Sequence, residues 1–418
     1  MYPNINPKWD YLSFGKENWR LLAFGILLNF CASAGQTYFI SVFGGEIRSE
    51  FSLSHGNFGL LYSLATVTSA VLLFWLGRII DHIDLRIFSV CVSVGLAGAS
   101  LLMSFSINIA SLSLAFFALR LLGQGLMAHT AFTTTARYID DKRGTAVSII
   151  FLGLTAGLAF FPILGVWLSN NFGWRNTWLY LGLSYLIVLA PIVAWLLNDH
   201  HQRHKEFLSK LNRDTNQANQ HNDQKNVHEV LRDYKFYLIV PAFMAPAFIF
   251  TGFLFHQVHL VETKGWSLTW FASGFTGLAI ASFVTSLLLG PLIDRMKAVR
   301  LLPFFLLPFA IALSLLASSN HPWIAPISLL FMGINVGAFH TLFGAVWAEI
   351  YGVVHLGAIR AVAHVFQVIA SALSPILFGE LIDIGISIET IAIACIGYVF
   401  IASILTRLAN HQPLAQSD

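Results

Sequence analysis

Long apolar segments alternate with short polar ones along almost the whole chain. A helix needs about 20 apolar residues to cross a lipid bilayer, and twelve segments reach or approach that length. They lie near residues 21–43, 57–77, 87–106, 109–135, 145–169, 177–197, 236–260, 268–292, 301–318, 323–347, 361–383 and 387–407. The pattern predicts an all-α membrane protein with twelve transmembrane helices.

One long polar stretch, residues 198–235, joins the sixth predicted helix to the seventh. It is rich in Asn, Gln, Lys and His and has too few apolar residues to bury a core, so we interpret it as a cytoplasmic linker. Residues 1–197 are then expected to form an N-terminal six-helix bundle. Residues 236–418 are expected to form a C-terminal six-helix bundle with a short tail.

Two short phrases recur 213 residues apart. Gly77-Arg-Ile-Ile-Asp81-His82 ends the second predicted helix, and Gly290-Pro-Leu-Ile-Asp294-Arg295 ends the eighth. Pro162-Ile-Leu164 and Pro375-Ile-Leu377 have the same offset. The equal offsets indicate a duplicated membrane unit. Duplicated membrane units are typical of secondary transporters, whose substrate site lies between the halves.

The residues before the second and eighth predicted helices also correspond. Phe51-Ser-Leu-Ser54 precedes one helix and Trp266-Ser-Leu-Thr269 precedes the other. We predict Ser54 and Thr269 as N-caps, because a hydroxyl can accept a hydrogen bond from the first turn of a helix. Their offset of 215 predicts a two-residue length difference between the repeats.

Composition supports a membrane protein and excludes several other classes. Of the 418 residues, 56% are hydrophobic and 11% are charged, whereas soluble domains carry roughly 25% charged residues. The net charge of +3 is too small to indicate a nucleic-acid partner. Cys31, Cys91 and Cys395 all lie in apolar segments, so we expect small buried side chains and neither a disulfide framework nor a metal site.

The distribution of basic residues predicts the orientation in the membrane. Twelve spans place both termini on one side, and 20 of the 24 Lys and Arg residues lie on that side. The opposite side holds only Arg48, Arg175 and Lys264. Because cytoplasmic loops carry an excess of cations, both termini are expected in the cytoplasm. The membrane is expected to be a bacterial inner membrane.

The remaining cation, Arg120, lies inside the fourth predicted helix. It is eleven residues from the start of that helix, or about 16 Å deep at 1.5 Å per residue. A cation at mid-membrane costs at least ~2.5 kcal/mol on insertion scales. Arg120 is therefore expected to face a central cavity or to bond to helix backbone, and Gln124 follows one turn later. Contact with the solute and bracing of helices 1 and 4 remain equally supported.

Other polar residues inside the predicted helices are candidates for the same cavity. Asn29, Ser33 and Gln36 share one face of the first helix, and Asn335 lies near the middle of the tenth. Interhelical hydrogen bonding is the alternative role for each of them.

Histidines are the candidates for a coupling proton, because histidine titrates near neutral pH and the predicted helices have no Asp or Glu at mid-depth. His256 lies near the outer end of the seventh helix and His340 lies deep in the tenth. His364 lies near the cytoplasmic end of the eleventh, and His256 or His340 is the better candidate for the coupling proton. For each single histidine, a packing role is the simpler interpretation.

Twelve spans in two halves, a long linker and the Gly-x-x-x-Asp phrase resemble the major facilitator superfamily. That resemblance implies a conformational latch at each phrase, where an Asp binds a neighbouring helix end or an Arg. The first copy keeps Gly77, Asp81 and Arg86, with His82 where Arg is usual. The second keeps Gly290, Asp294 and Arg295. We predict that the latches stabilise the outward-open form.

Several further motifs resemble the monocarboxylate and oxalate–formate antiporter branch of that family. They are Arg120-Leu-Leu-Gly-Gln124-Gly125, Arg143-Gly-Thr-Ala146, the pair Gly153 and Gly157, Pro162, and Gly173-Trp-Arg175. Members of this branch commonly carry a substrate-binding Arg in helix 8. The eighth predicted helix of this chain has no cation at all, which departs from the pattern of a simple monocarboxylate carrier.

The predicted function is secondary active transport of a small organic anion, such as a carboxylate, by alternating access. A mid-membrane Arg without a matching acid creates a positive cavity, which favours an anionic solute. We expect a monomer driven by a proton or ion gradient, with no bound cofactor or metal. The alternative is a proton antiporter that exports amphiphilic compounds or a siderophore-like metabolite. A membrane enzyme is disfavoured, because the loops lack a convincing catalytic set.

Overall fold

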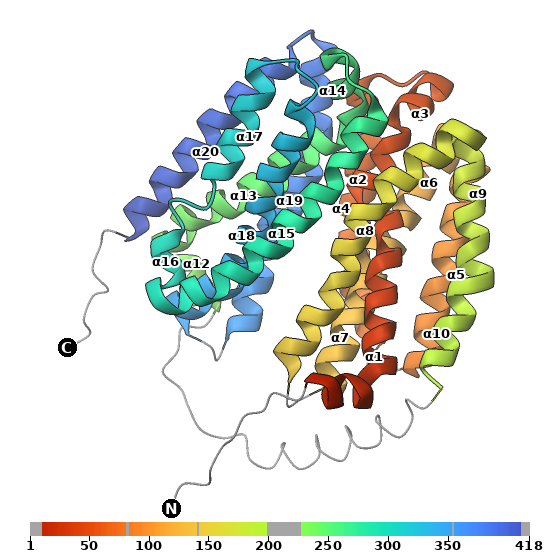
Figure 1. Ribbon diagram of the computed structural model, residues 1–418, viewed down its shortest axis with the longest axis horizontal. Helices are drawn as coiled ribbons and strands as arrows, with labels where there is room; N and C mark the ends of the chain where they lie inside the picture. Colours follow the sequence, from red (N-terminus) through yellow and green to blue (C-terminus); the bar gives the residue numbers. More distant parts are fainter. Residues whose placement is uncertain (1–10, 81–82, 140–141, 199–226, 353–354, 411–418) are drawn as a thin grey trace, which may run out of the picture.

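The computed structural model describes residues 11–80, 83–139, 142–198, 227–352 and 355–410, and the regular elements within these ranges are helices (Figure 1). The N-terminal group contains α1 (Tyr11–Cys31), α2 (Thr37–Ile40), α3 (Gly44–Phe51), α4 (His55–Ile79), α5 (Leu85–Ser104), α6 (Ile109–Leu119), α7 (Ala128–Tyr138), α8 (Arg143–Phe172), α9 (Trp174–Ser184) and α10 (Ala190–Leu196). The C-terminal group contains α12 (Val227–Arg232), α13 (Tyr234–Phe255), α14 (Gln257–Lys264), α15 (Leu268–Met296), α16 (Ala298–Leu301), α17 (Leu307–Ser318), α18 (Ile324–Tyr351), α19 (Leu356–Asp383) and α20 (Ile388–Asn410).

The described helices account for the predicted membrane spans. Ten helices are long and apolar enough to cross a bilayer, and a bent pair, Phe14–Gly35 with Thr37–Phe51, provides an eleventh span. In place of the predicted helix at 301–318 stand the short α16, a turn and the 12-residue apolar α17. The all-α membrane fold expected from the sequence is therefore confirmed.

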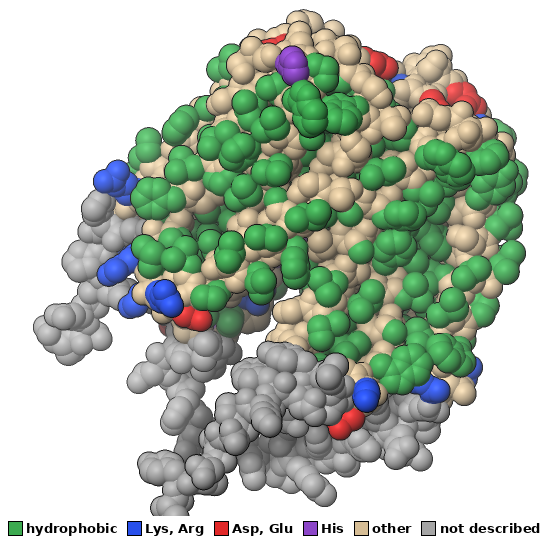
Figure 2. Space-filling model, in the orientation of Figure 1, with side chains coloured by type: hydrophobic (Ala, Val, Ile, Leu, Met, Phe, Trp, Pro, Cys, Tyr) green, Lys and Arg blue, Asp and Glu red, His purple; other side chains and the backbone are tan. Residues whose placement is uncertain are grey.

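The exposed surface of the helices is apolar, as expected for contact with lipid. Large apolar side chains such as Phe74, Trp75 and Leu288 are more than half exposed, and Figure 2 shows hydrophobic side chains spread over the visible face. Most of the Lys and Arg side chains on that face lie along the edge that carries the termini. An exposed apolar surface of this extent is stable in contact with lipid tails.

The two groups of helices meet along two seams. α4 packs against α19, and α8 packs against α15. In the repeat, α4 corresponds to α15 and α8 to α19, so the two seams are equivalent to each other. The groups lie close together at the end opposite the termini and diverge toward the end that carries them (Figure 1). We call the opposite end the outer end.

The first span is broken where we predicted a continuous helix. A 3₁₀ turn ends at Gly35, Gln36 is extended (φ −86°, ψ 149°), and the axis bends by 50°. The N–H groups of Phe39 and Ile40 both donate to the carbonyl of Gln36. The break lies against Gly123 of the fourth span, and a Cβ at Gly35 would stand only 2.2 Å from a backbone oxygen of that span.

The helix caps correct the predicted length difference between the repeats. Ser54 is the N-cap of α4, as predicted, and its hydroxyl accepts from Asn57 N–H at 3.1 Å. The N-cap of α15 is Ser267 and not Thr269: its hydroxyl accepts from Trp270 N–H at 3.3 Å. Ser54 and Ser267 are separated by the same 213 residues as the Gly-x-x-x-Asp phrases, so no insertion is needed between them.

Candidate functional site

Arg120 lies at the centre of the N-terminal group, where the break in the first span meets the fourth. It begins a π-helical stretch, Arg120–Met127, between α6 and α7; such stretches are frequent at functional sites. Its Nη1 donates to the carbonyl of Gly35 at 3.1 Å. Its Nε donates to the hydroxyl of Thr66 on α4 at 3.1 Å, and its guanidinium lies 5.0 Å from the ring centre of Tyr62. Arg120 thus binds three spans together and is only 4% exposed.

Arg120 also lines a cavity of about 130 Å³ between the two halves. Its walls come from α4, from the π-helical stretch and, across the seam, from α19. The lining residues are Thr66, Ser69, Ala70, Leu73, Arg120, Gln124, Gly125, His364, Val368 and Ser371. None of these residues is acidic, and one of them is an arginine.

The C-terminal half contributes histidines to this region. His364 lines the cavity and is exposed, and its Nδ1 lies 3.1 Å from Oε1 of Gln367. His340 on α18 is also exposed. Its ring lies 5.6 Å from that of Phe151 on α8, across the boundary between the halves. Of the predicted site residues, Arg120 and Gln124 therefore share one cavity, and His340 faces the space between the halves.

Two other candidates, Asn29 and Asn335, each hold helices together within one bundle. The amide nitrogen of Asn29 donates to Ile150 O at 3.0 Å and joins α1 to α8. The amide nitrogen of Asn335 donates to Phe305 O at 2.8 Å and holds the turn before α17. Both side chains are buried. Gln36 is half-buried at the break in the first span.

His256 lies at the outer end, away from the cavity. α13 ends at Phe255, five residues earlier than predicted, and His256 separates it from α14. The ring is 3% exposed, and its Nε2 is 2.9 Å from the carbonyl oxygen of Pro375 on α19.

The two predicted latches lie at the end that carries the termini. Asp81 is outside the described residues. Gly77 is buried against His129, whose Nε2 lies 3.1 Å from Gly77 O, and Arg86 is exposed at the start of α5.

In the second copy, Asp294 and Arg295 are exposed, and a Cβ at Gly290 would meet open space. The acid that binds a helix start here is Glu349 of α18, which accepts from Ala298 N–H at 2.7 Å and from Val299 N–H at 3.1 Å. The latch role of Asp294 stays a prediction for the other conformation.

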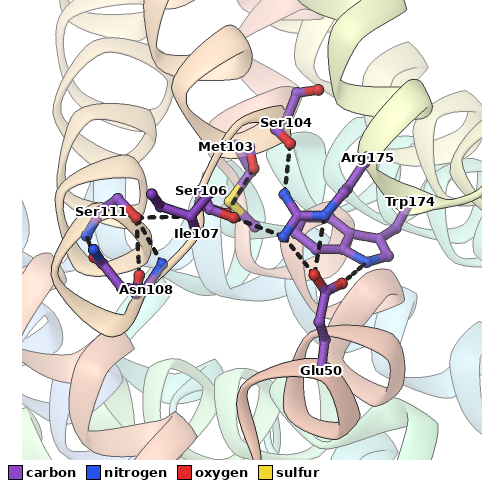
Figure 3. Close-up of polar contacts among 9 residues, drawn as sticks. All are labelled: Glu50, Met103, Ser104, Ser106, Ile107, Asn108, Ser111, Trp174 and Arg175. Carbon is purple, nitrogen blue, oxygen red and sulfur yellow. Dashed lines mark hydrogen bonds and ion pairs between the residues drawn. The ribbon is translucent and has the colours of Figure 1, made fainter.

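The Gly173-Trp-Arg175 motif braces the outer end of the N-terminal half (Figure 3). The Arg175 guanidinium forms an ion pair with Glu50 of α3. It also donates to the carbonyls of Ser104, the last residue of α5, and of Ser106 in the connection that follows, both at 2.6 Å. Trp174 Nε1 donates to the other oxygen of Glu50 at 3.0 Å. α3, α9 and the α5–α6 connection are therefore held as one unit.

Sequence reasoning missed the contribution of α4 to the cavity. Thr66 and Ser69 lie one turn apart and face Arg120. Ser371 of α19 faces them from the other half. A stripe of small hydroxyl residues in a spanning helix was the available signal, because such residues point into a bundle. They come together near Arg120 because α4 of one half packs against α19 of the other, and the sequence does not show which helices pack together.

The fold and the cavity define a multi-pass membrane transporter built from two related helical halves. Two stretches of the chain, residues 25–281 and 248–417, match the model of the Major Facilitator Superfamily. The chain therefore belongs to this family, whose members are carriers and not enzymes.

One known transporter resembles part of the chain in sequence, and two solved structures resemble nearly all of it in fold. Human monocarboxylate transporter 6 is 24% identical over 151 residues, which is 35% of this chain and 29% of that protein. The match thus spans less than a third of that relative. Two structures of a bacterial homolog to the human lysosomal transporter Spinster share the fold at 16% identity. The inward-facing, occupied form has a TM-score of 0.66, covering 96% of this chain and 97% of the other. The inward-facing, unoccupied form has a TM-score of 0.64, covering 94% of this chain and 96% of the other.

Proposed function

We propose that the protein is a secondary active transporter of a small organic anion, such as a carboxylate. The observation that carries this proposal is the cavity between the halves, which holds Arg120 and His364 and has no acid among its lining residues. A low-dielectric cavity with a fixed cation favours an anion, and a guanidinium matches the two oxygens of a carboxylate. The name of the human relative, a monocarboxylate transporter, supports the same class of solute.

The size of the cavity also favours a small solute. At about 130 Å³ it is close to an engineered cavity of ~150 Å³ that binds benzene. Drug-sized ligands occupy pockets of roughly 300–1,000 Å³. A small carboxylate therefore suits this conformation better than the siderophore-like or amphiphilic compounds of the alternative.

The proposed cycle places both termini in the cytoplasm, in accord with the excess of Lys and Arg on their side. The conformation described above then opens inward, and its outer end is closed. His340 and His364 lie on the open side and are available to exchange a coupling proton with the cytoplasm. The lipid bilayer and the solute are the only partners this mechanism needs, and we expect a monomer.

A thermal-shift screen of the purified protein tests the solute class. A solute present at 100 times its Kd stabilises the protein by about 2.7 kcal/mol. We expect small carboxylates to raise the Tm, and we expect the shift to disappear in Gln124→Ala. Gln124 lines the cavity and is half-buried, so its removal should leave the Tm without solute unchanged. Stabilisation by cationic or neutral amphiphiles alone would favour the exporter.

A further inference from the structure

Three histidines from the two halves meet at the outer end. His55 is the first residue of α4, in the N-terminal half. His256 and His259 belong to the start of α14, in the C-terminal half. The ring centre of His55 lies 4.5 Å from that of His259 and 5.6 Å from that of His256. The described residues contain no group of His, Cys, Asp and Glu suited to hold a metal ion, so metal binding does not explain this cluster.

The cluster lies at a direct connection between the halves. The carboxylate of Asp383, at the end of α19, accepts from His55 N–H at 3.0 Å and from Gly56 N–H at 2.7 Å. α4 and α19 also touch through backbone, since a Cβ at Gly379 would stand 2.4 Å from the carbonyl oxygen of His55. The histidines can therefore stay together only while the outer end is closed.

Charged groups surround the histidines on every side. Arg48 of α3 is the cation that acts on all three of them. The acids are Asp383 and Glu380 of α19, Glu262 of α14 and Glu389 of α20. Asp383 already binds two N–H groups, and Glu389 forms an ion pair with Lys264.

Two polar atoms in the cluster are unsatisfied. Nδ1 of His55 and Nε of Arg48 are buried and have no hydrogen-bond partner among the described residues. Burial lowers the pKa of His259, and the charge of Arg48 lowers it further, against the smaller opposing effects of the nearby acids. The closed arrangement therefore disfavours additional positive charge.

An aromatic layer separates the cluster from the Arg120 cavity. Phe255 of α13 stacks on Phe58 of α4 at 4.7 Å and contacts Tyr62 at 4.6 Å. Tyr62 in turn lies over Arg120. A proton that reaches the histidines therefore comes from the outer side and not from the solute cavity.

We propose that His55, His256 and His259 form a proton-binding site that controls the outer closure. When the outer end opens, α4 separates from α14 and α19, and the imidazoles leave Arg48 and gain water. The open form binds protons more readily than the closed form, so protons shift the equilibrium toward it. The effect is absent well above the ordinary histidine pKa of about 6.5 and grows as the outer pH falls below it. The residue equivalent to His55 at the start of α15 is Leu268. The proposed proton-binding site is therefore a feature of the α4–α19 seam and not of the α8–α15 seam.

Distance measurements between spin labels test the proposal. Ile107 and Ile384 are 82% and 70% exposed at the outer ends of the two halves, and both can be changed to labelled Cys after Cys31, Cys91 and Cys395 are replaced. The full chain is measured in lipid nanodiscs at pH 7.5 and pH 5.0. We expect a several-fold increase of the long-distance population at pH 5.0.

Three variants decide between this proposal and a general effect of acid. His55→Gln combined with His259→Gln should keep the distances of pH 7.5 at both pH values. His321→Gln, at an exposed histidine before α18, should respond as the parent does. Arg48→Gln should keep the distances of pH 7.5 and show a smaller increase at pH 5.0, because loss of this charge raises the pKa of His259 in the closed form and narrows its difference from the open form. An unchanged or shortened distance in the parent at pH 5.0, or a full response in the double variant, would overturn the proposal.

Discussion

At the scale of single residues, Arg120 braces three spans and also lines the cavity, so the two roles that the sequence left as alternatives are compatible. One edge of its guanidinium satisfies Gly35 O, and another binds Thr66. The same side chain lines the cavity between the halves. A buried cation is tolerated when it is well bonded, so bracing does not conflict with the proposed contact with the solute. The position of Arg120 inside a span was evident from the sequence, but its partners were not, because they lie on two other spans.

We predict that Arg120→Ala lowers the stability of the protein even without solute. The substitution leaves the buried Gly35 carbonyl unpaired, and an unsatisfied buried group costs about 1–3 kcal/mol. Arg120→Lys should recover part of this loss, because one ammonium cannot reproduce the fork of the guanidinium. Thermal unfolding in detergent measures both variants. Arg407→Ala, at an exposed arginine of α20, is the control, and equal Tm values for Arg120→Ala and Arg407→Ala would refute the bracing role.

At the scale of elements, the α4–α19 seam closes the outer end. Its close approach depends on glycines: a Cβ at Gly59 would lie 2.3 Å from the carbonyl oxygen of Pro375. The hydropathy pattern located the spans because a bilayer imposes a fixed apolar length. It could not show the break at Gly35–Gln36, because the carbonyl exposed there is satisfied by Arg120 from another span. The N-cap Ser267 was misplaced by two residues because Ser and Thr both suit that position.

We predict that Gly59→Val prevents the outer end from closing. The added side chain cannot fit against the backbone of α19, so the outward-open form becomes the more stable one. Labelling of Gln124→Cys by an impermeant thiol reagent from the outer side, in a background without the native cysteines, should increase. Gly277→Val is the matched control, since a Cβ at Gly277 meets open space within α15. Equal labelling of the two variants would contradict the assigned role of this seam.

At the scale of the whole molecule, the sequence repeat explains how the two halves meet and where the cavity lies. Equivalent helices form the two seams between the halves, and the cavity lies beside one of them. The duplication was visible in the sequence because two phrases keep the same offset. The composition of the cavity was only partly visible, since α4 and α19 face each other across a boundary that no local pattern reveals. Movement of the halves about these seams would expose Arg120 to each side in turn.

The most direct test of this account is uptake of a small radiolabelled carboxylate, chosen from the thermal-shift screen, into proteoliposomes with an imposed pH gradient. We predict accumulation by the parent protein and by Arg407→Ala. Arg120→Ala should lower the initial rate about tenfold or more, because loss of a hydrogen bond to a charged group costs about 1.5–3 kcal/mol and 1.4 kcal/mol is a factor of ten. Absence of flux for every carboxylate, together with transport of another solute that Arg120→Ala leaves unaltered, would contradict the account.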